Sequence, residues 1–354
     1  MDQSGSHVSF PHQELVAQLT PQYEAREFLE PEAPANGSTN TIVLFRDCVA
    51  RIHDPGQLYR TAAFVEVEVA ILDALETADF PSPRVLRTRD GSPLFRWHYG
   101  EMTGHGVLLS RCPGGPVPAT LPATAVAELL GRLHAALLLR PPRFASVAEA
   151  RALKAAKEPC EPEDIVRTGA QVAERIRLQD GAAAALLDRL LAVAAVPAAV
   201  TVEGVVHLDL VSDAASFFFA SVFSLSERAQ NRTNLLYEEA SGRLSLVDFD
   251  FAMPGPLLLD VGFALVEYCC DARGTFDAAT AAAFLRAYAA QRPLRQGELA
   301  GGLKKYFAVV WIRSLAWLWG SPAHWRRPEL LQFGKRVAPV VRSVLDWDAD
   351  HVFT

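Results

Sequence analysis

The stretch VVHLDL at residues 205–210 sets two polar side chains, His207 and Asp209, among valines and leucines. A second run of this kind, LSLVDFD at 244–250, carries Asp248. The apolar, partly β-branched flanks predict two short buried strands. A carboxylate at the end of a buried strand is costly to bury alone, so we expect each acid to face a cleft, a cation or a hydrogen-bond donor. Asp209 and Asp248 are therefore predicted to supply a base and a metal ligand.

Asn234 completes the first motif once an interruption is removed. Twenty-four residues separate it from Asp209, but without residues 211–230 the text becomes HLDLNRTN, with four residues between the acid and the amide. Kinase-type catalytic loops have that spacing, because the aspartate accepts the proton of the substrate hydroxyl while the asparagine binds magnesium. The spacing predicts a phosphoryl-transfer loop that contains His207, Asp209 and Asn234.

Residues 211–230, VSDAASFFFASVFSLSERAQ, have neither helical nor strand periodicity. The segment begins with Val-Ser, as a GTGAGT splice donor would be translated, and ends with Gln, as a CAG acceptor would be. We interpret it as a retained in-frame intron, which predicts a eukaryotic gene with short introns and a translated product of impaired activity. The alternative is a genuine loop insertion, whose exposed Phe217–Phe219 would be a docking patch or an aggregation-prone site.

The N-terminal third of the chain is typical of a small sheet with one helix. Thr41–Phe45 and Cys48–His53 are rich in β-forming residues, and Arg46-Asp47 between them fits a hairpin turn. Between residues 62 and 78 apolar side chains recur at helical spacing, and Pro81-Ser82-Pro83 follows as a stop signal. We therefore expect one helix packed on an antiparallel sheet.

The break RCPGG at residues 111–115 marks a domain boundary. Residues 1–111 are predicted to form a small N-terminal lobe, and residues 112–354 a larger, mainly helical lobe in which the two β-like runs make a small catalytic sheet. The fold class is thus α+β with two lobes. Apolar residues at i, i+3 and i+4 predict the helices of the second lobe over 124–139, 162–197, 276–292, 299–320 and 327–346.

In this order and spacing, the motifs resemble those of the small-molecule kinases of the aminoglycoside phosphotransferase and choline kinase-like family, including its homoserine kinase-like branch. The resemblance runs from about residue 36 to residue 319. It implies a bilobal protein kinase-like fold and an ATP- and Mg²⁺-dependent O-phosphotransferase. Three stretches carry it: HLD at 207–209 with Asn234, VDF at 247–249 followed by PGP at 254–256 and Asp260, and RIHDPG at 51–56 followed by Glu68 and PSPRV at 81–85.

The resemblance implies a role for each residue of the catalytic loop and metal site. Asp209 would position and deprotonate the acceptor hydroxyl, while His207 would brace the loop. Asn234 and Asp248 would bind Mg²⁺, a hard cation that prefers oxygen ligands. Asp260 would accept hydrogen bonds from the catalytic-loop backbone; a plain helix N-cap is the alternative.

Nucleotide binding is assigned by the same resemblance to the N-terminal lobe. Arg51 stands where the family has a lysine that grips the α- and β-phosphates, and Glu68 would be its helix partner, whereas Glu66 would point elsewhere on the helix. Arginine is longer and forked, so reduced ATP affinity or turnover is expected. A surface arginine and glutamate is the alternative. The remaining expected nucleotide contacts are Ser38 and Asn40 in a phosphate-covering turn, and Leu109 and Arg111 in an interlobe hinge whose backbone meets adenine.

Charge and composition exclude several kinds of partner. The 354 residues hold 34 basic and 41 acidic side chains, a formal charge of −7, whereas nucleic acid or an anionic membrane would require a basic face. The N-terminus lacks a secretion signal, and no run approaches the roughly 18 apolar residues of a membrane span. We therefore expect a cytoplasmic protein. The five cysteines form no C-x-x-C pair and are predicted to be reduced core thiols.

The acceptor is predicted from the charges near the second motif. Six acids and one base lie between residues 248 and 277, which favours a small, amine-bearing alcohol, although the same acids could form a solvated face. Five of the six tryptophans lie in the last 44 residues. Their helical spacing favours packing core over an aromatic wall for an ammonium group. The acceptor's identity and the oligomeric state stay open.

Two other classes of function are compatible with these residues. Arg51 and the interrupted loop would also suit a catalytically impaired kinase-like nucleotide-binding protein. A metal-dependent hydrolase using His207, Asp209, Asp248 and Asp250 ranks last, because the chain has too few histidines at ligand spacing.

Overall fold

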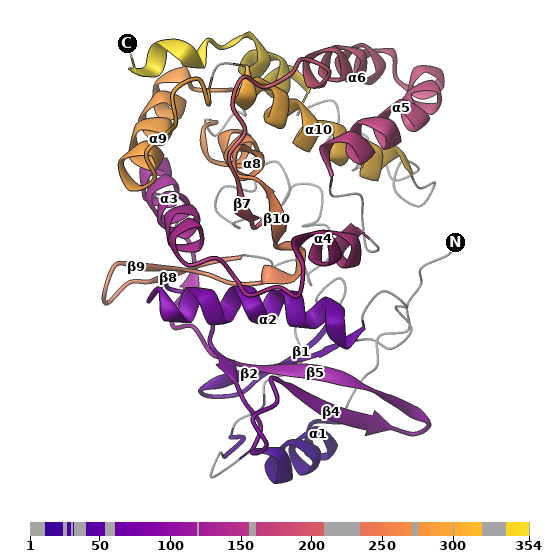
Figure 1. The fold of residues 1–354 in the computed structure, drawn as a ribbon, viewed down its shortest axis with the longest axis vertical. Helices are drawn as coiled ribbons and strands as arrows, with labels where there is room; N and C mark the ends of the chain where they lie inside the picture. Colours follow the sequence, from indigo (N-terminus) through magenta and orange to yellow (C-terminus); the bar gives the residue numbers. More distant parts are fainter. Residues whose placement is uncertain are drawn as a thin grey trace.

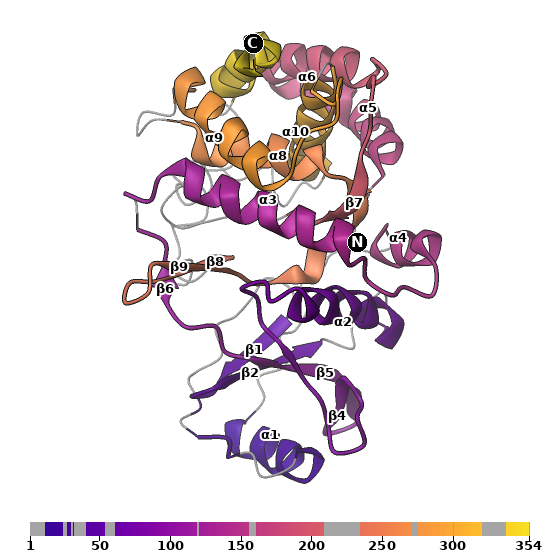
Figure 2. The same cartoon turned by 60° about the vertical axis from the view of Figure 1, so that its left-hand side comes forward.

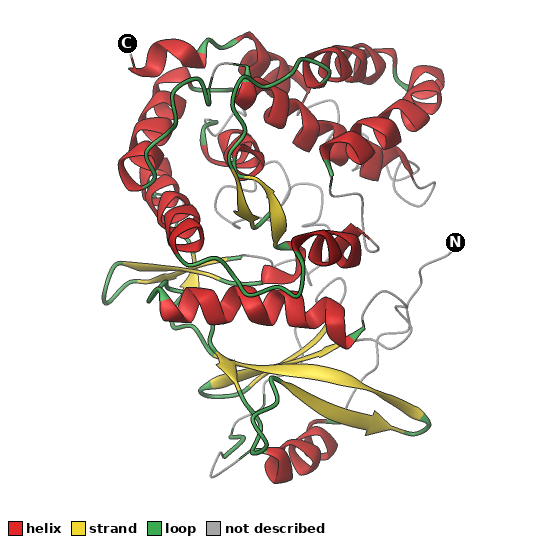
Figure 3. Cartoon of the chain, viewed as in Figure 1, coloured by secondary structure: helices red, strands yellow, loops and turns green. Residues whose placement is uncertain are grey.

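The computed structural model describes residues 11–23, 27–29, 31, 40–53, 61–118, 120–155, 161–208, 234–270, 275–299, 301–320 and 338–353. Within these ranges an antiparallel sheet flanked by helices forms one end of the molecule, and a group of helices forms the other (Figures 1 and 3). The predicted α+β fold with a small sheet-bearing lobe and a larger helical lobe is confirmed. Ser38, Asp209 and the 211–230 segment lie outside the described residues.

The N-terminal sheet begins with the predicted hairpin. β1 (Asn40–Leu44) pairs antiparallel with β2 (Cys48–His53), and the Phe45 N–H donates to the Cys48 carbonyl at 2.8 Å to close the turn. The long strand β5 (Met102–Ser110) is the centre of the five-stranded sheet, because it pairs with β2, β3 (Val85–Leu86) and β4 (Leu94–Tyr99).

Side-chain alternation along β2 assigns its residues to opposite faces of the sheet. Ala50 and Ile52 belong to the cluster that also contains the buried leucines of α1 (His12–Leu19). Arg51, between them, contacts Glu68 of α2 (Ala62–Thr77) on the other face. The sequence predicted one helix on this sheet. α1 was missed because eight residues give too short a periodic pattern.

The helical lobe differs from the prediction by a break in one helix and by two helices, over 147–155 and 258–268, that were not predicted. The segment predicted as one helix over 162–197 is broken at Asp180, whose carboxylate accepts from the Ala182 and Ala183 N–H groups at 3.0 Å and so caps a new helix. Of the segment 327–346, residues 338–346 are helical and 327–337 lie outside the described residues. The helices are α3 (Ala123–Leu139), α4 (Val147–Ala155), α5 (Pro162–Gln179), α6 (Gly181–Ala194), α8 (Leu258–Tyr268), α9 (Ala278–Gln291) and α10 (Gly302–Gly320), with the 3₁₀ turns η1 (Thr20–Gln22) and η3 (Ala349–Phe353).

The expectation of one small catalytic sheet is wrong, because the two β-like runs belong to separate ladders. β7 (Glu203–Val206) pairs with β10 (Met253–Pro256), whereas β9 (Arg243–Leu246) pairs with β8 (Leu235–Glu238), which also pairs with β6 (Gly115–Pro116). The chain leaves the path of β9 at Asp248, which adopts a left-handed backbone conformation, and then forms the 3₁₀ turn η2 (Phe249–Phe251). Asp248 therefore lies in the turn between β9 and β10 and belongs to neither strand pair.

α2 lies at the junction of the two lobes (Figures 1 and 2). The Thr61 hydroxyl accepts from the Phe64 N–H at 3.2 Å and caps its N-terminus. The helix covers the sheet and also packs against α3, α4 and η2 of the helical lobe. It presents Glu68 as a buried side chain, whereas Glu66 is exposed, as the helical spacing predicts.

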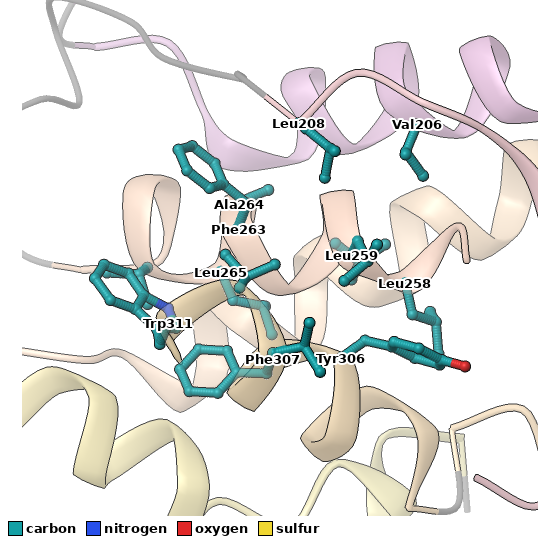
Figure 4. Packing of buried hydrophobic residues seen from close by; sticks show 14 of the residues in the cluster. Val206, Leu208, Leu258, Leu259, Phe263, Ala264, Leu265, Tyr306, Phe307 and Trp311 are labelled. Atoms are coloured by element: carbon teal, nitrogen blue, oxygen red, sulfur yellow. The ribbon is translucent and has the colours of Figure 1, made fainter. Parts of the chain in front are cut away.

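The core of the helical lobe is formed where α8 packs on α10 (Figure 4). Gly262 allows the close approach, because a Cβ at that position would lie 2.9 Å from the Phe307 Cα. Trp311 and Trp319 are buried in this layer, so the prediction of tryptophans as packing core is confirmed for these two residues.

The described cysteines, Cys48, Cys112, Cys269 and Cys270, are free thiols. Cys48 and Cys269 are buried, as expected for core thiols, and the other two are half-buried. Among the helices that the structure describes, none has the length and apolar character needed to cross a membrane.

Candidate active site

The Asp260 carboxylate fixes the backbone that leads into the predicted catalytic loop. Its Oδ2 accepts from the His207 N–H and its Oδ1 from the Leu208 N–H, both at 2.7 Å. The side chain is fully buried, and its third contact is the ring of His134, 3.1 Å away, whose other nitrogen lies 2.8 Å from the Tyr288 hydroxyl. Asp260 is thus the backbone acceptor that the sequence predicted and not an N-cap, since α8 begins before it.

His207 joins the catalytic loop to the segment that carries Asp248. Its Nε2 lies 3.1 Å from the Val247 carbonyl, which can only accept, so this nitrogen carries the proton. The ring also packs edge-on against Phe249, with centroids 4.8 Å apart. The buried ring of His207 therefore ties the two segments together, and the role of a brace stays a prediction.

Leu208 is the last described residue before the predicted base, and its backbone is held by contacts on both sides. Leu208 has φ of 61°, a left-handed conformation that costs energy for a leucine and persists only where surrounding contacts impose it. Its N–H is held by Asp260, and its carbonyl lies 3.4 Å from a guanidinium nitrogen of Arg313. Strained backbone held from both sides is typical of positions that orient a functional side chain.

Asn234 and Asp248 are adjacent through their backbones. The Val247 N–H donates to the Asn234 carbonyl at 2.8 Å. Asp248 follows with φ of 61° and ψ of 71°, and its side chain is 46% exposed. One amide oxygen and one half-exposed carboxylate are the ligands that suit Mg²⁺, which keeps several waters in such sites. The donor set therefore fits a magnesium ion held by few protein ligands.

Arg51 connects the two lobes at this point. Its guanidinium forms a buried ion pair with Glu68 of α2, and its Nη1 lies 3.3 Å from the Asp248 Oδ1. Burial lowers the pKa of Arg51, but the carboxylates of Glu68, Asp250 and Asp248 outweigh it and leave the pKa raised. Burial raises the pKa of Glu68, and the Arg51 cation opposes that shift. The alternative of a surface arginine and glutamate is excluded by the burial of both side chains.

The other described residues that are expected to contact the nucleotide lie in or beside the β1–β2 hairpin. The Oδ1 of Asn40 lies 3.0 Å from the Nδ1 of His53 inside the hairpin. The Arg111 N–H donates to the Asp47 carbonyl at 3.0 Å and its guanidinium to the Phe45 carbonyl at 2.9 Å, so both groups bind the hairpin. Leu109 lies between β2 and β3 within the sheet. The contacts of these residues with a nucleotide stay predictions.

The structure shows that most of the acids that favoured a cationic acceptor are buried or already engaged in other contacts. Asp250 and Glu267 are buried, Asp260 binds the loop backbone, and Asp277 caps α9 by accepting from the Ala279 N–H at 2.9 Å. The alternative of a solvated acidic face is therefore excluded for the buried acids. The number of acids between residues 248 and 277 does not measure the negative charge of the candidate site. Residues 271–274 lie outside the described part.

Three residues of the site region escaped the sequence analysis, namely His134, Tyr288 and Lys154. His134 and Tyr288 support Asp260 from α3 and α9, and the Lys154 ammonium donates to the Asp250 carbonyl at 3.0 Å. Each comes from a helix without a recognisable motif, so the sequence offered only a buried polar residue on an apolar helix face as a signal.

The comparisons with known proteins identify the family. The model of the phosphotransferase enzyme family matches residues 31–213 and 231–294, more than half of the chain. The chain belongs to this family. The gap in the match, residues 214–230, falls within the interruption recognised in the sequence.

Curated relatives of this phosphotransferase-family chain include homoserine kinases. One from Pseudomonas aeruginosa (strain UCBPP-PA14) is 30% identical over 230 residues, which cover 64% of this chain and 60% of that protein. Another, from Cupriavidus taiwanensis, is 38% identical over 120 residues, which cover 29% of this chain and 36% of the relative. The alignments thus span less than two thirds of the relatives' length.

Solved structures share the fold across almost the whole chain. Amicoumacin kinase in complex with AMP-PNP, Ca²⁺ and amicoumacin has a TM-score of 0.61 at 14% identity and covers 93% of this chain and 94% of its own. A microcompartment-associated aminopropanol kinase has a TM-score of 0.57 at 18% identity, with coverage of 96% and 99%. At these identities the likeness establishes the protein kinase-like architecture.

Proposed function

We propose that this chain is an ATP- and Mg²⁺-dependent O-phosphotransferase that acts on the hydroxyl of a small molecule. The observation that carries the proposal is the contact of Arg51 with both Glu68 and Asp248, which joins a buried cation from the sheet to a half-exposed carboxylate of the helical lobe. A metal-dependent hydrolase stays the last-ranked alternative, because the chain has too few histidines at ligand spacing.

In the proposed reaction, the acceptor's hydroxyl oxygen bonds to the γ-phosphorus of ATP, the bond to the β–γ bridging oxygen breaks, and ADP leaves. Asp209 accepts the hydroxyl proton, and Asp260 holds the backbone of the two residues before it. Arg51 offers the nucleotide phosphates its forked donors while Glu68 holds its orientation. Asn234 and Asp248 would hold Mg²⁺, which when bound neutralises charge on the phosphate oxygens.

An alcohol that also carries an amine is the proposed acceptor. The matched proteins include a homoserine kinase and an aminopropanol kinase, each named for an alcohol that also carries an amino group. The number of acids near Asp248 does not support this acceptor, because the buried Asp250 and Glu267 are not surface charges.

A catalytically impaired nucleotide-binding protein is the second candidate. It is favoured by the position of the interruption, which separates Asp209 from Asn234 in the sequence and coincides with the gap in the family match. A displacement of about 1 Å between a base and its substrate costs about a hundredfold in rate. We infer that residues 211–230 are a retained intron, so the spliced product would have the unbroken loop. A transcript spanning this junction supports the inference if it lacks the segment and contradicts it if the segment is retained.

The decisive experiment compares the full chain with a variant lacking residues 211–230. ATP turnover is measured against homoserine, aminopropanol, ethanolamine and choline, and nucleotide binding is measured alongside. The kinase proposal predicts turnover with one of these acceptors, and Asp209→Ala in the shortened chain should abolish it. Binding without turnover in the shortened chain would favour the second candidate, and turnover that survives Asp209→Ala would refute the assigned base.

A further inference from the structure

Lys154, near the end of α4, is a buried cation that the proposed chemistry does not use. Its residue surface is 2% exposed. The Nζ donates to the Asp250 carbonyl at 3.0 Å and lies 3.9 Å from the centroid of the Phe64 ring. A buried ammonium is costly unless its donors and charge are satisfied, so these contacts are the reason that the side chain can be accommodated there.

The two contacts of Lys154 join the same two segments that Arg51 joins. Asp250 lies two residues after Asp248 in η2, and Phe64 lies one helical turn before Glu68 on the same face of α2. Arg51 reaches these segments from β2 on the sheet, and Lys154 reaches them from α4 in the helical lobe. The turn that presents Asp248 is thus held by cations from both lobes.

α4 has a second attachment to this segment. Arg151, one turn before Lys154, donates from Nε to the Pro254 carbonyl at 3.2 Å and forms ion pairs with Glu203 and Glu161. α4 also packs against α2 and β10, beside which it lies in Figures 1 and 2. Two basic residues of α4, one helical turn apart, therefore bind two backbone carbonyl groups. That of Asp250 lies before the start of β10, and that of Pro254 lies within the strand.

We propose that Lys154 is a positioning residue for the magnesium–nucleotide site. It fixes the turn from Asp248 to Phe251 against α2, so that the Asp248 carboxylate keeps the direction that Arg51 and a bound metal require. It acts through the Asp250 carbonyl and the Phe64 ring and touches no substrate. The effect of Lys154 on nucleotide binding rests on the proposed function, whereas its attachment of the turn to α2 depends only on the folded chain.

The charges around Lys154 support this role. Two cations, Arg51 and Lys154, accompany three carboxylates, those of Glu68, Asp248 and Asp250. Burial and Asp250 raise the pKa of Glu68, while Arg51 and Lys154 lower it. The charge of Lys154 therefore opposes the rise in the pKa of Glu68 that burial causes.

The test uses the full chain with Lys154→Met, which keeps the apolar stem without the charge, and Lys154→Arg, which keeps a donor for the carbonyl. Arg175→Met is the matched control, because Arg175 also donates to backbone carbonyls, those of Trp319 and Gly320, at 2.7 and 3.0 Å, away from the site. Phe64→Leu removes the ring face, together with part of the buried side-chain volume, and serves if Lys154→Met does not fold.

The first measurement is amide hydrogen exchange of residues 249–252. Losing a hydrogen bond from a charged donor should speed exchange of these amides by at least about tenfold in Lys154→Met, with a smaller effect in Lys154→Arg and none in Arg175→Met. The same order, with Phe64→Leu in the place of Lys154→Met, supports the attachment if the latter is unfolded. Unchanged exchange in folded Lys154→Met, or in Phe64→Leu when it alone folds, overturns the proposal.

The second measurement is the affinity for AMP-PNP with Mg²⁺, by calorimetry well below the unfolding temperature of each variant. We expect at least about tenfold weaker binding in Lys154→Met, recovery in Lys154→Arg, and no change in Arg175→Met. Faster exchange with unchanged affinity would reduce Lys154 to a stabilising residue and overturn the functional part. If neither the unsubstituted chain nor the variant lacking residues 211–230 binds AMP-PNP, the proposed function fails, and the exchange data still decide the attachment.

Discussion

The Nη1 of Arg51 lies 3.3 Å from the Oδ1 of Asp248, although the two residues are 197 positions apart in the chain. One belongs to the sheet of the small lobe and the other to the turn that follows β9 in the helical lobe. The arginine is buried, whereas the carboxylate is half-exposed. The contact therefore joins the two lobes at the proposed binding site of the nucleotide phosphates.

Arg51→Met should weaken ATP binding and destabilise the fold together. The change leaves Glu68 buried without its cation, and breaking a buried pair in this way costs about 3–5 kcal/mol. Arg51→Lys keeps the charge but not the fork, so we expect a smaller loss in both quantities. The KM for ATP and the urea midpoint measure the two effects. Glu66→Gln, on the exposed side of α2, is the control and should change neither. An Arg51→Met protein with unaltered KM would contradict the assigned phosphate contact.

Asp260→Asn should lower kcat much more than it raises the KM for ATP. The amide can accept only through one oxygen, so one of the two backbone N–H groups, of His207 or Leu208, loses its partner. The expected decrease in kcat is roughly a hundredfold, because the base is displaced. Asp277→Asn, which alters only a helix cap, should cost at most about 1 kcal/mol of stability and leave kcat unchanged. Equal kcat in the two variants would contradict the role of Asp260.

Sequence motifs predicted the parts of the site that lie on the chain in a recognisable order. The resemblance predicted that Arg51 pairs with Glu68, and the alternation along β2 explains why Arg51 faces α2. The contact of Arg51 with Asp248 was not predicted. The hydrogen bonds of Arg111 to the hairpin were not predicted either, since which carbonyl an amide binds depends on the twist and register of strands that the sequence does not specify.

Local sequence patterns could not predict which distant residues contact and support the candidate site. Lys154 and His134 reach the site from helices whose apolar periodicity predicts only a buried face, and that periodicity is satisfied by any packing partner. The pairing of β7 with β10 was also missed. The run 244–251 has strand composition throughout, and only the left-handed backbone at Asp248 divides it.

Gly262→Ala should destabilise the helical lobe. The added methyl group would lie 2.9 Å from the Phe307 Cα, which is backbone and cannot rotate away, so α8 and α10 must separate. Overpacking of this kind costs about 1–3 kcal/mol. Gly181→Ala, at the open start of α6 with nothing within 4 Å of the new Cβ, is the matched control and should be neutral or slightly stabilising. Urea unfolding of both variants measures the difference, and equal midpoints would show that the helices do not pack as described.

Cys112 should react slowly with iodoacetamide despite being only half-buried. Burial raises the pKa of its thiol to about 11, above the usual value of about 8.5, so the reactive thiolate is a fraction of about one in a thousand at pH 8. Since the pKa lies above the range tested, the rate should rise about tenfold per unit between pH 7 and pH 9. Mass spectrometry of the peptide containing residue 112 follows the reaction, and Cys112→Ser confirms the assignment. An ordinary exposed thiol would instead level off by pH 9, and that behaviour at Cys112 would contradict its burial beside β8 and β9.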